Sequence, residues 1–520
     1  MHEELVDRLR VDLRSAEYSA DAIAGLLGSV ADGARQRGVW APALRALNGR
    51  AGEPLAILVR CFLLGTAVTA RELDAALPEL RAAGAEQLGL VAAIGNTLVS
   101  PDESELRAAL SLNPVRIDDG EEWLVLSDLD DQLRRGPARA DHVMGVGGAT
   151  RSLLVQAPTA PVDLALDLGT GCGIVAMHLT QCAEHVIATD ISERALDLAR
   201  LNARLNSVQD RIEFRHGDLF APVAADRFDL ILSNPPFVIT PRSGDTPVYA
   251  YRDGGKTGDA LAQSVIEAGP ALLRDGGTLL CLANWESPWG ENGLSRVEEW
   301  LTVASGACGP LSAWVIERDR VEPVQYAETW VRDGGARPGE SAFESLLGLW
   351  IDDFARRRIT AVGLGSVRVQ RTVATTNIVA GAAPVVHLDA ATGAFSIESG
   401  LGDALQRAFE VGSATARMTL EAVLETRWLL DTTVIEIREH QPGEEAPRRI
   451  SLETVRPIAR RVAADPLLAA ALGACDGELT LAQIADALAT LLEVDAAAAS
   501  DALVAGVREL AWFGMLEPAA

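Results

Sequence analysis

The middle of the chain alternates short β-branched runs with stretches of helical periodicity, and this pattern restricts the fold more than any other feature. Such runs are typical of buried strands, and the stretches between them predict helices, for example over 193–206 and 260–273. Strands alternating with helices form parallel, doubly wound sheets with right-handed crossovers. We therefore expect an α/β domain with a seven-stranded sheet. The candidate strands are 163–168, 185–190, 212–215, 230–233, 277–282, 313–316 and 366–369.

A chain of 520 residues is too long for one core and should form about three domains. Residues 1–140 are expected to be a mainly helical N-terminal domain with a role in substrate recognition. The α/β domain is expected over 141–378, with an insertion around 321–358. Gly381-Ala382-Ala383-Pro384 is typical of a linker, and residues 385–520 have the helix order of a small winged-helix-like domain.

The charge of the chain argues against a general nucleic-acid binder. The formal net charge is −27 and the pI is about 4.7, whereas non-specific binding to phosphate needs a basic surface. Residues 389–520 carry 21 acidic residues against 10 arginines, so the winged-helix-like domain would repel phosphate. We expect it to contact protein or to serve a structural role.

Neither a metal site nor a membrane anchor is expected. The six cysteines show no C-x-x-C spacing, which favours free thiols in a reducing compartment. The first residues are charged rather than apolar, and no apolar run approaches about 18 residues. The composition predicts a cytoplasmic protein, and its oligomeric state stays open.

A glycine-rich turn, Leu-Asp-Leu-Gly-Thr-Gly-Cys-Gly over residues 166–173, follows the first predicted strand and opens a predicted helix. Glycines permit positive φ and remove the Cβ atoms that would keep a ligand from the backbone. The carboxyl edge of such a sheet is where ligands bind. The spacing differs from the G-x-G-x-x-G of dinucleotide sites, although a nicotinamide-binding fold and a purely structural turn stay open from the turn alone. The candidate cofactor-binding residues here are Asp167, Gly169, Thr170, Gly171 and Gly173.

The next two strand ends carry side chains that suit an adenosyl group. Asp190 closes the second strand and can accept hydrogen bonds from both ribose hydroxyls. Asp218, after the third strand, can accept from an adenine amino group. Ile191 and Leu219 would supply apolar walls for the ring. Three successive strand ends with fitting side chains favour an adenosyl cofactor over a structural turn.

Asn234-Pro235-Pro236-Phe237 ends the fourth predicted strand, beside the glycine turn. The lone pair of an amide or aromatic amine is delocalised, so its nitrogen is a poor nucleophile. Asn234 can accept one N–H through its side-chain oxygen and the Pro235 carbonyl can accept the other, which aims the nitrogen at an electrophile. The prolines stiffen the turn, and Phe237 offers a face for stacking. These residues are the catalytic candidates, and Asn234 also borders the cofactor.

The segment Tyr251–Asp259 resembles a P-loop only superficially, because residue 250 is alanine where a Walker A motif needs glycine. A glycine-rich turn that lines the acceptor pocket is the better interpretation. Whether Lys256 contacts the substrate stays open.

The residues Asp167–Gly173, Asp190, Asp218 and Asn234–Phe237 resemble class I S-adenosylmethionine-dependent methyltransferases of the Asn-Pro-Pro-Phe/Tyr type, which have a Rossmann-like fold. Together with Gly254-Gly255-Lys256-Thr257-Gly258, they are most similar to the HemK-like glutamine methyltransferases, which act on the Gly-Gly-Gln loop of translation release factors. The resemblance covers roughly residues 140–300 and implies S-adenosyl-L-methionine as the cofactor.

The resemblance leaves the acceptor open. This family usually has tyrosine where this chain has Phe237, and phenylalanine is also common in relatives that methylate base amino groups of RNA. A protein glutamine, for example in a translation factor, is favoured by the acidic composition. The alternatives are an RNA or DNA base, for which Arg356-Arg357-Arg358 could provide a basic funnel, a small metabolite, and a scaffold without activity.

Overall fold

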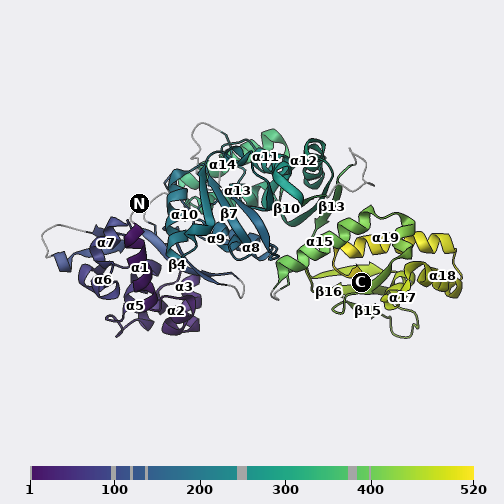
Figure 1. Cartoon of the computed structure of the whole chain (residues 1–520), viewed down its shortest axis with the longest axis horizontal. Helices are drawn as coiled ribbons and strands as arrows, with labels where there is room; N and C mark the ends of the chain where they lie inside the picture. The colour runs from purple at the N-terminus through teal and green to yellow at the C-terminus, as the bar shows by residue number, and fades with distance from the viewer. Residues whose placement is uncertain are drawn as a thin grey trace.

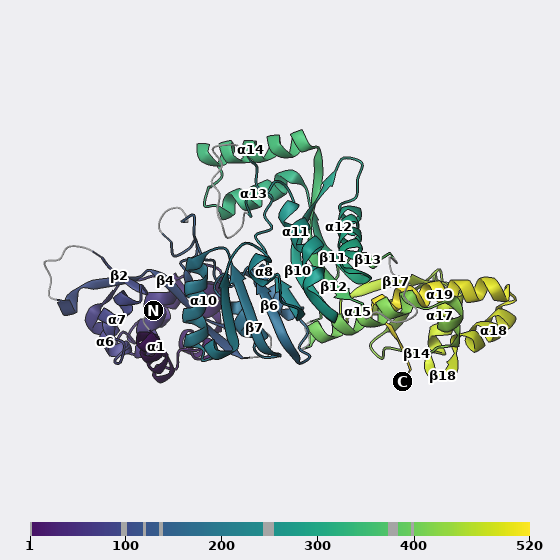
Figure 2. The same ribbon diagram turned by 45° about the horizontal axis from the view of Figure 1, so that its top comes forward.

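The computed structural model describes residues 3–94, 101–117, 121–134, 139–242, 254–372, 383–396 and 400–519. The chain forms three parts that lie in a row (Figure 1, Figure 2). The N-terminal part, up to residue 134, lies at one end and the C-terminal part, residues 400–519, at the other. The central part, residues 139–396, holds the large sheet.

The N-terminal part consists of short helices around one apolar core, with two small antiparallel sheets. Helices make up most of its regular secondary structure. Its helices are α1 (Glu3–Ser15), α2 (Ala20–Leu27), α3 (Ser29–Gln36), α4 (Ala41–Ala46), α5 (Pro54–Leu58), η1 (Val59–Leu63), α6 (Ala70–Ala76), α7 (Arg81–Gln87) and η2 (Pro101–Glu103). Its strands are β1 (Val68–Thr69), β2 (Val91–Ile94), β3 (Glu105–Ala108), β4 (Leu110–Arg116) and β5 (Glu122–Asp128).

The central sheet confirms the expected α/β architecture. Its strands are β6 (Val162–Leu168), β7 (Ala183–Asp190), β8 (Ile212–His216), β9 (Phe228–Ser233), β10 (Leu273–Pro288), β11 (Leu311–Val321), β12 (Ile359–Arg371) and β13 (Val385–Ala390). Their order is β13-β11-β12-β10-β9-β6-β7-β8, and only β12 runs antiparallel to its neighbours. Each of the seven predicted strands is present.

The sheet has an eighth strand that the sequence did not predict. β13 pairs in parallel with β11 at the edge of the sheet, whereas the sequence places its residues at the start of the C-terminal domain. Ala383-Pro384, directly before this run, is typical of the end of a linker, so the sequence does not indicate a strand of the sheet here. Gly381 and Ala382 of that expected linker lie outside the described residues.

Helices cover both faces of the sheet. The helices of the central part are α8 (Gly148–Val155), α9 (Ile174–Leu179), α10 (Glu193–Leu205), η3 (Gln209–Arg211), η4 (Ala221–Val223), α11 (Ala260–Ala268), η5 (Gly269–Leu272), α12 (Gly293–Cys308), α13 (Pro323–Asp333) and α14 (Ser341–Arg357). Adjacent strand residues alternate between two cores, as the period-2 geometry of a strand requires. Ala165 and Val186 pack with α9 and α10, whereas Leu166 and Ile187 pack with α11 and α12.

Two helices stand apart from these layers. α13 and α14 lie between β11 and β12 in the chain, where the sequence predicts an insertion, and they rise above one edge of the sheet (Figure 2). They share an apolar core with Val238 and Ile239, the residues that directly follow Asn-Pro-Pro-Phe.

The C-terminal part has two three-stranded sheets. The first has the order β18-β14-β19 and shares an apolar core with the helices. The second is the meander β15-β16-β17, which the sequence did not predict. The elements are α15 (Leu401–Arg417), α16 (Leu420–Glu425), β14 (Arg427–Leu430), β15 (Ile435–Glu439), β16 (Arg449–Thr454), β17 (Arg460–Ala464), α17 (Pro466–Gly473), β18 (Asp476–Thr480), α18 (Leu481–Leu492), α19 (Ala496–Trp512) and β19 (Leu516–Pro518). Trp512 stacks on His387 of β13, with ring centroids 4.8 Å apart. Across the described ranges, every helix is too short or too polar to cross a bilayer.

Candidate functional site

The two sequence motifs meet at the point where the sheet reverses its winding direction. The chain runs from β6 outward to β7 and β8 and then returns to β9 on the other side of β6. Ligands bind at such a switch point, outside the carboxyl ends of the strands. Leu168 and Ser233 are partners in the β6–β9 ladder, and the Ser233 hydroxyl donates to the Leu168 carbonyl at 2.9 Å. Gly169 and Asn234, the next residues along each strand, therefore lie side by side.

The glycine-rich turn leaves open space over its backbone. Gly169 and Gly171 have φ values of +80° and +53°, a region that favours glycine. A Cβ atom added at either residue would meet no atom within 4 Å. The Gly169 and Thr170 N–H groups both donate to the Thr189 carbonyl, at 3.0 and 2.8 Å, so the turn is fixed while its outer surface stays free.

Gly173 has a different role in the same turn. A Cβ atom there would come within 2.9 Å of the Ala199 side chain on α10. Gly173 therefore permits α9 and α10 to approach each other, rather than a ligand to approach the turn.

Asp167 lies beneath the turn rather than facing the open space. It is 1% exposed, and its Oδ2 accepts from the Thr170 hydroxyl at 2.5 Å and the Ala176 N–H at 2.9 Å. Burial raises the pKa of Asp167 to about 7, although both hydrogen bonds act to lower it. The geometry indicates that Asp167 and Thr170 shape the turn from below.

Asp190 closes β7 and faces the turn. Its Oδ2 accepts from the Gly171 N–H at 2.9 Å and its Oδ1 from the Ser192 N–H at 2.8 Å. Burial raises the pKa of Asp190 above its ordinary value, against these hydrogen bonds. A carboxylate offers about four lone-pair sites, so the side chain can still accept hydroxyl groups from a ligand. Ile191, the next residue, is 63% exposed, which is unusual for an isoleucine in a structured region.

The end of β8 lies beside Asp190. The Gly217 N–H donates to the Asp190 carbonyl at 3.0 Å, and His216 Nε2 lies 2.8 Å from the Ile191 carbonyl oxygen. Asp218 follows with an exposed side chain, and Leu219 is half-buried with a positive φ of 44°. The structure thus brings the candidate residues of three strand ends to one edge of the sheet.

Asn234 shows the clearest sign of an unfilled contact. Its side-chain NH₂ donates to the Thr150 hydroxyl on α8 at 3.1 Å. Its Oδ1 is buried, and among the described residues it has no hydrogen-bond donor. Buried polar atoms without a partner are rare because each costs about 1–3 kcal/mol, so the atom points to a missing ligand. Pro235 beside it is buried.

The insertion holds the segment that follows Asn234. Phe237 is half-buried and packs against two apolar cores. One is the core that the N-terminal part shares with α9 and α10, and the other is the core around α13 and α14. Tyr326 of α13 is 2% exposed, and its hydroxyl accepts from the Ile239 N–H at 3.1 Å and from the Asn284 side chain at 2.8 Å. The aromatic residue of the motif is therefore supported from the insertion.

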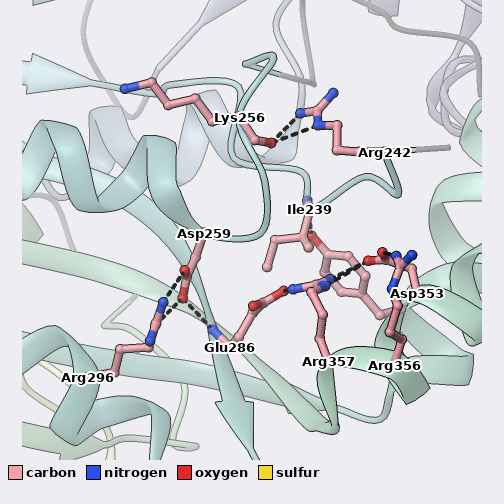
Figure 3. Close-up of polar contacts among 10 residues, drawn as sticks. Ile239, Arg242, Lys256, Asp259, Glu286, Arg296, Asp353, Arg356 and Arg357 are labelled. Atoms are coloured by element: carbon pink, nitrogen blue, oxygen red, sulfur yellow. Dashed lines mark hydrogen bonds and ion pairs between the residues drawn. The ribbon is translucent and has the colours of Figure 1, made fainter. Parts of the chain in front are cut away.

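The second glycine turn, residues 254–258, is followed by a buried charge network, shown in Figure 3. Asp259 is 2% exposed in its side chain and accepts from Arg296 at 2.8 and 3.0 Å and from the Glu286 N–H at 3.0 Å. Lys256 points away from this network, and its Nζ donates to the Ser264 hydroxyl on α11 at 2.7 Å. Residues 251–253 of this segment lie outside the described residues.

The arginines at the end of α14 do not form a basic funnel. Arg357 pairs with Glu286 and with Asp353, the latter at 2.6 and 2.9 Å, and Arg356 also pairs with Asp353 (Figure 3). Arg358 ends the helix with an exposed side chain. Two of the three charges are compensated locally, so little of this cluster is left to attract phosphate.

Asn202 of α10 joins the glycine turn to the N-terminal part. Its amide is fully buried and exchanges hydrogen bonds with both backbone groups of Leu126 in β5, each at 2.8 Å. The same NH₂ also donates to the Cys172 carbonyl in the turn at 2.8 Å. Asn206, one helical turn later, repeats the pattern with the backbone of Leu124 at 2.9 and 2.8 Å.

Comparisons with known proteins find similarity in two regions of the chain. Residues 144–302 match the family described as methyltransferase small domain, and residues 15–101 match a domain of unknown function (DUF7059). The central part is similar to the HemK-like methyltransferases. A release factor glutamine methyltransferase of Cereibacter sphaeroides is 40% identical over 141 residues, which cover 25% of this chain and 50% of that protein. A ribosomal protein uL3 glutamine methyltransferase of Bradyrhizobium diazoefficiens is 35% identical over 151 residues, 27% of this chain and 46% of that protein.

This chain thus spans about half the length of the curated relatives it matches. Among solved structures, a methyltransferase from Pyrococcus furiosus is 17% identical with a TM-score of 0.25, covering 43% of this chain and 82% of that chain. The fold assignment rests on the strand order rather than on that overlap.

Three residues that shape the site are not among those that the sequence motifs predict. Thr150, Asn202 and Tyr326 come from α8, α10 and α13, and each contacts a motif residue or its neighbour. None belongs to a motif, and Tyr326 lies beyond the matched methyltransferase domain. An asparagine pair spaced by four residues on an amphipathic helix was the one available signal, for Asn202 and Asn206.

Proposed function

We propose that the chain is an S-adenosylmethionine-dependent N-methyltransferase that acts on a planar amide, with a glutamine side chain of a protein as the acceptor. The observation that carries the proposal is the buried, unpaired Oδ1 of Asn234 at the switch point of the sheet, beside the open glycine turn. An N–H of the acceptor amide would supply the donor that this oxygen lacks.

The residues around the turn fit the cofactor. The space over Gly169 and Gly171 would admit its amino-acid portion, and the free lone pairs of Asp190 would accept its ribose hydroxyls. Asp218 would accept from the adenine amino group, with Ile191 and Leu219 against the ring. When bound, S-adenosylmethionine supplies an electrophilic methyl group on sulfur.

The acceptor half would orient the nucleophile. Asn234 Oδ1 accepts one N–H of the acceptor amide and the Pro235 carbonyl the other, while Phe237 packs against the amide plane. These contacts would direct the amide nitrogen toward the methyl group that the cofactor would supply, and the proton lost from nitrogen would pass to water. Asp167, Thr170 and Gly173 act by holding the turn in shape.

Two observations support a protein acceptor. The relatives named above are glutamine methyltransferases of a release factor and of a ribosomal protein. The net charge of −27 and the paired arginines Arg356 and Arg357 disfavour a nucleic acid. The N- and C-terminal domains, over 1–140 and 385–520, would then recognise the protein, and a translation factor as substrate would place the reaction in the cytoplasm.

The test is transfer of label from tritiated S-adenosylmethionine to proteins, RNA and small molecules of a lysate from a strain that lacks the gene. We expect label in protein, on glutamine after peptide mass spectrometry. The variant Asn234→Ala should bind the cofactor normally in calorimetry and lose at least about a hundredfold in rate. Label confined to RNA, or full activity of Asn234→Ala, would refute the proposal.

A further inference from the structure

The side-chain amide of Asn234 has an NH₂ group and an oxygen, and only the NH₂ group has a hydrogen-bond partner among the described residues. The NH₂ end is bonded to the hydroxyl of Thr150, at 3.1 Å, in the first turn of α8. The oxygen end is buried and has no donor among the described residues. Thr150 itself is half-buried, so its hydroxyl lies at the rim of the site rather than in bulk solvent.

We propose that Thr150 is a positioning residue that fixes the amide of Asn234 with its oxygen toward the acceptor, and that the N-terminal part holds Thr150 in place. This inference rests on the proposed function, because it assigns Thr150 a role in the same acceptor site. The hydrogen bond to the hydroxyl anchors one end of the amide. Without it the amide can turn about its Cβ–Cγ bond, and its oxygen no longer stays directed at the substrate N–H.

The segment that leads into α8 is tied to the N-terminal part. The Val143 N–H donates to Asp128 of β5 at 2.7 Å. Gly145 packs so closely on Ser127 that a Cβ atom would come within 2.8 Å of its hydroxyl. Asp128 is in turn paired with Arg194 of α10, at 2.5 and 2.7 Å, so β5, α10 and this segment form one unit.

A second contact fixes α8 directly. Arg151, next to Thr150, donates to the Arg116 carbonyl at the end of β4 at 2.9 Å. The hydroxyl of Thr150 is therefore placed by β4 and β5, which lie outside the matched methyltransferase domain. On this basis the N-terminal part completes the acceptor site in addition to any contact with a substrate.

The experiment compares three substitutions of Thr150 in the full chain. Thr150→Val keeps the shape and removes the hydroxyl, Thr150→Ala removes both, and Thr150→Ser keeps the hydroxyl. Each is assayed for tritium transfer from S-adenosylmethionine to protein of the gene-deleted lysate, with cofactor affinity measured by calorimetry and folding by thermal unfolding. Asn234→Ala is the reference for a site without its acceptor residue.

We expect Thr150→Val and Thr150→Ala to slow transfer by about 10- to 100-fold at saturating cofactor, because a misdirected acceptor costs about this much. The dissociation constant of the cofactor should change by less than about twofold, and Thr150→Ser should transfer at nearly the wild-type rate. A purely structural role would instead lower the unfolding temperature of all three variants alike.

The outcomes separate the two proposals. If wild type labels protein and Asn234→Ala does not, but Thr150→Val and Thr150→Ala are as fast as wild type, the role of Thr150 is refuted and the proposed function stands. If Thr150→Ser is as slow as Thr150→Val, the hydroxyl is not the group that matters and the inference also fails. If wild type labels no protein, the proposed function itself fails.

Discussion

The link between the N-terminal part and the glycine turn can be tested at Asn202. Replacement by leucine keeps the side-chain size but removes three hydrogen bonds, each at 2.8 Å, to the Leu126 N–H, the Leu126 carbonyl and the Cys172 carbonyl. Asn202 is fully buried, so water cannot take its place. Three stranded buried groups at about 1 kcal/mol or more each predict a loss of at least about 3 kcal/mol in the free energy of unfolding.

Asn206→Leu provides a matched control. Asn206 bonds to the backbone of Leu124 in the same way but is only half-buried, so solvent can replace its contacts, and we expect a loss of about 1 kcal/mol. Urea unfolding gives the free energies, and hydrogen exchange followed by mass spectrometry gives the protection of 122–128. Asn202→Leu should also weaken cofactor binding in calorimetry, because Cys172 lies in the turn.

Equal stability losses in the two variants would contradict this reasoning. So would unchanged exchange over 122–128 in Asn202→Leu, since the strand would then be held by other contacts. Loss of stability with unchanged cofactor affinity would refute only the link to the turn.

Two further substitutions test the residues that support the glycine turn and the segment after Asn-Pro-Pro-Phe. Asp167→Asn retains an acceptor for both hydrogen bonds but removes a carboxyl whose pKa burial raises to about 7. The unfolded carboxyl ionises near pH 4, so the free energy of unfolding of the wild type falls as pH rises from about 4 to about 7. In urea unfolding, the variant should therefore gain about 3 kcal/mol relative to wild type between about pH 5 and about pH 8. A difference between the two proteins that does not change with pH would contradict the assignment. Tyr326→Phe leaves the Ile239 N–H without its acceptor, so it should lower the free energy of unfolding by about 2 kcal/mol and slow methyl transfer. The control is Tyr18→Phe. Tyr18 is also buried, but its hydroxyl donates to the Leu112 carbonyl at 2.7 Å, so its loss should lower stability alone. Equal transfer rates for these two variants would argue against support of the motif by α13.

The sequence predicts seven of the eight strands of the central sheet, because apolar runs alternate with helical stretches along this part of the chain. The glycine turn and Asn-Pro-Pro-Phe each follow directly on such a strand, so the switch point brings them together once the strand order is known. The strand β13 could not be predicted from Val-Val-His-Leu-Asp-Ala alone, because its partner β11 is separated from it by α13, α14 and β12.

The side-chain contacts of the site were less accessible. Asp167 is an acidic residue at a position where an acidic ligand-binding residue would also be expected. Only its burial and its hydrogen bond to Thr170 show that it holds the turn from below. Thr150 and Tyr326 act across distances of 84 and 87 residues along the chain. Such contacts depend on tertiary packing, which no local pattern encodes.

The second glycine turn has a practical consequence. Lys256 is the only lysine of the 520 residues, so a lysine-specific protease has a single cleavage site, on the loop between β9 and α11. The hydrogen bond from Lys256 to Ser264 holds that site against α11. Cleavage gives the fragments 1–256 and 257–520, which an ordinary gel separates without any label. The rate of cleavage therefore measures how often Lys256 leaves α11, and whether a bound acceptor slows this step.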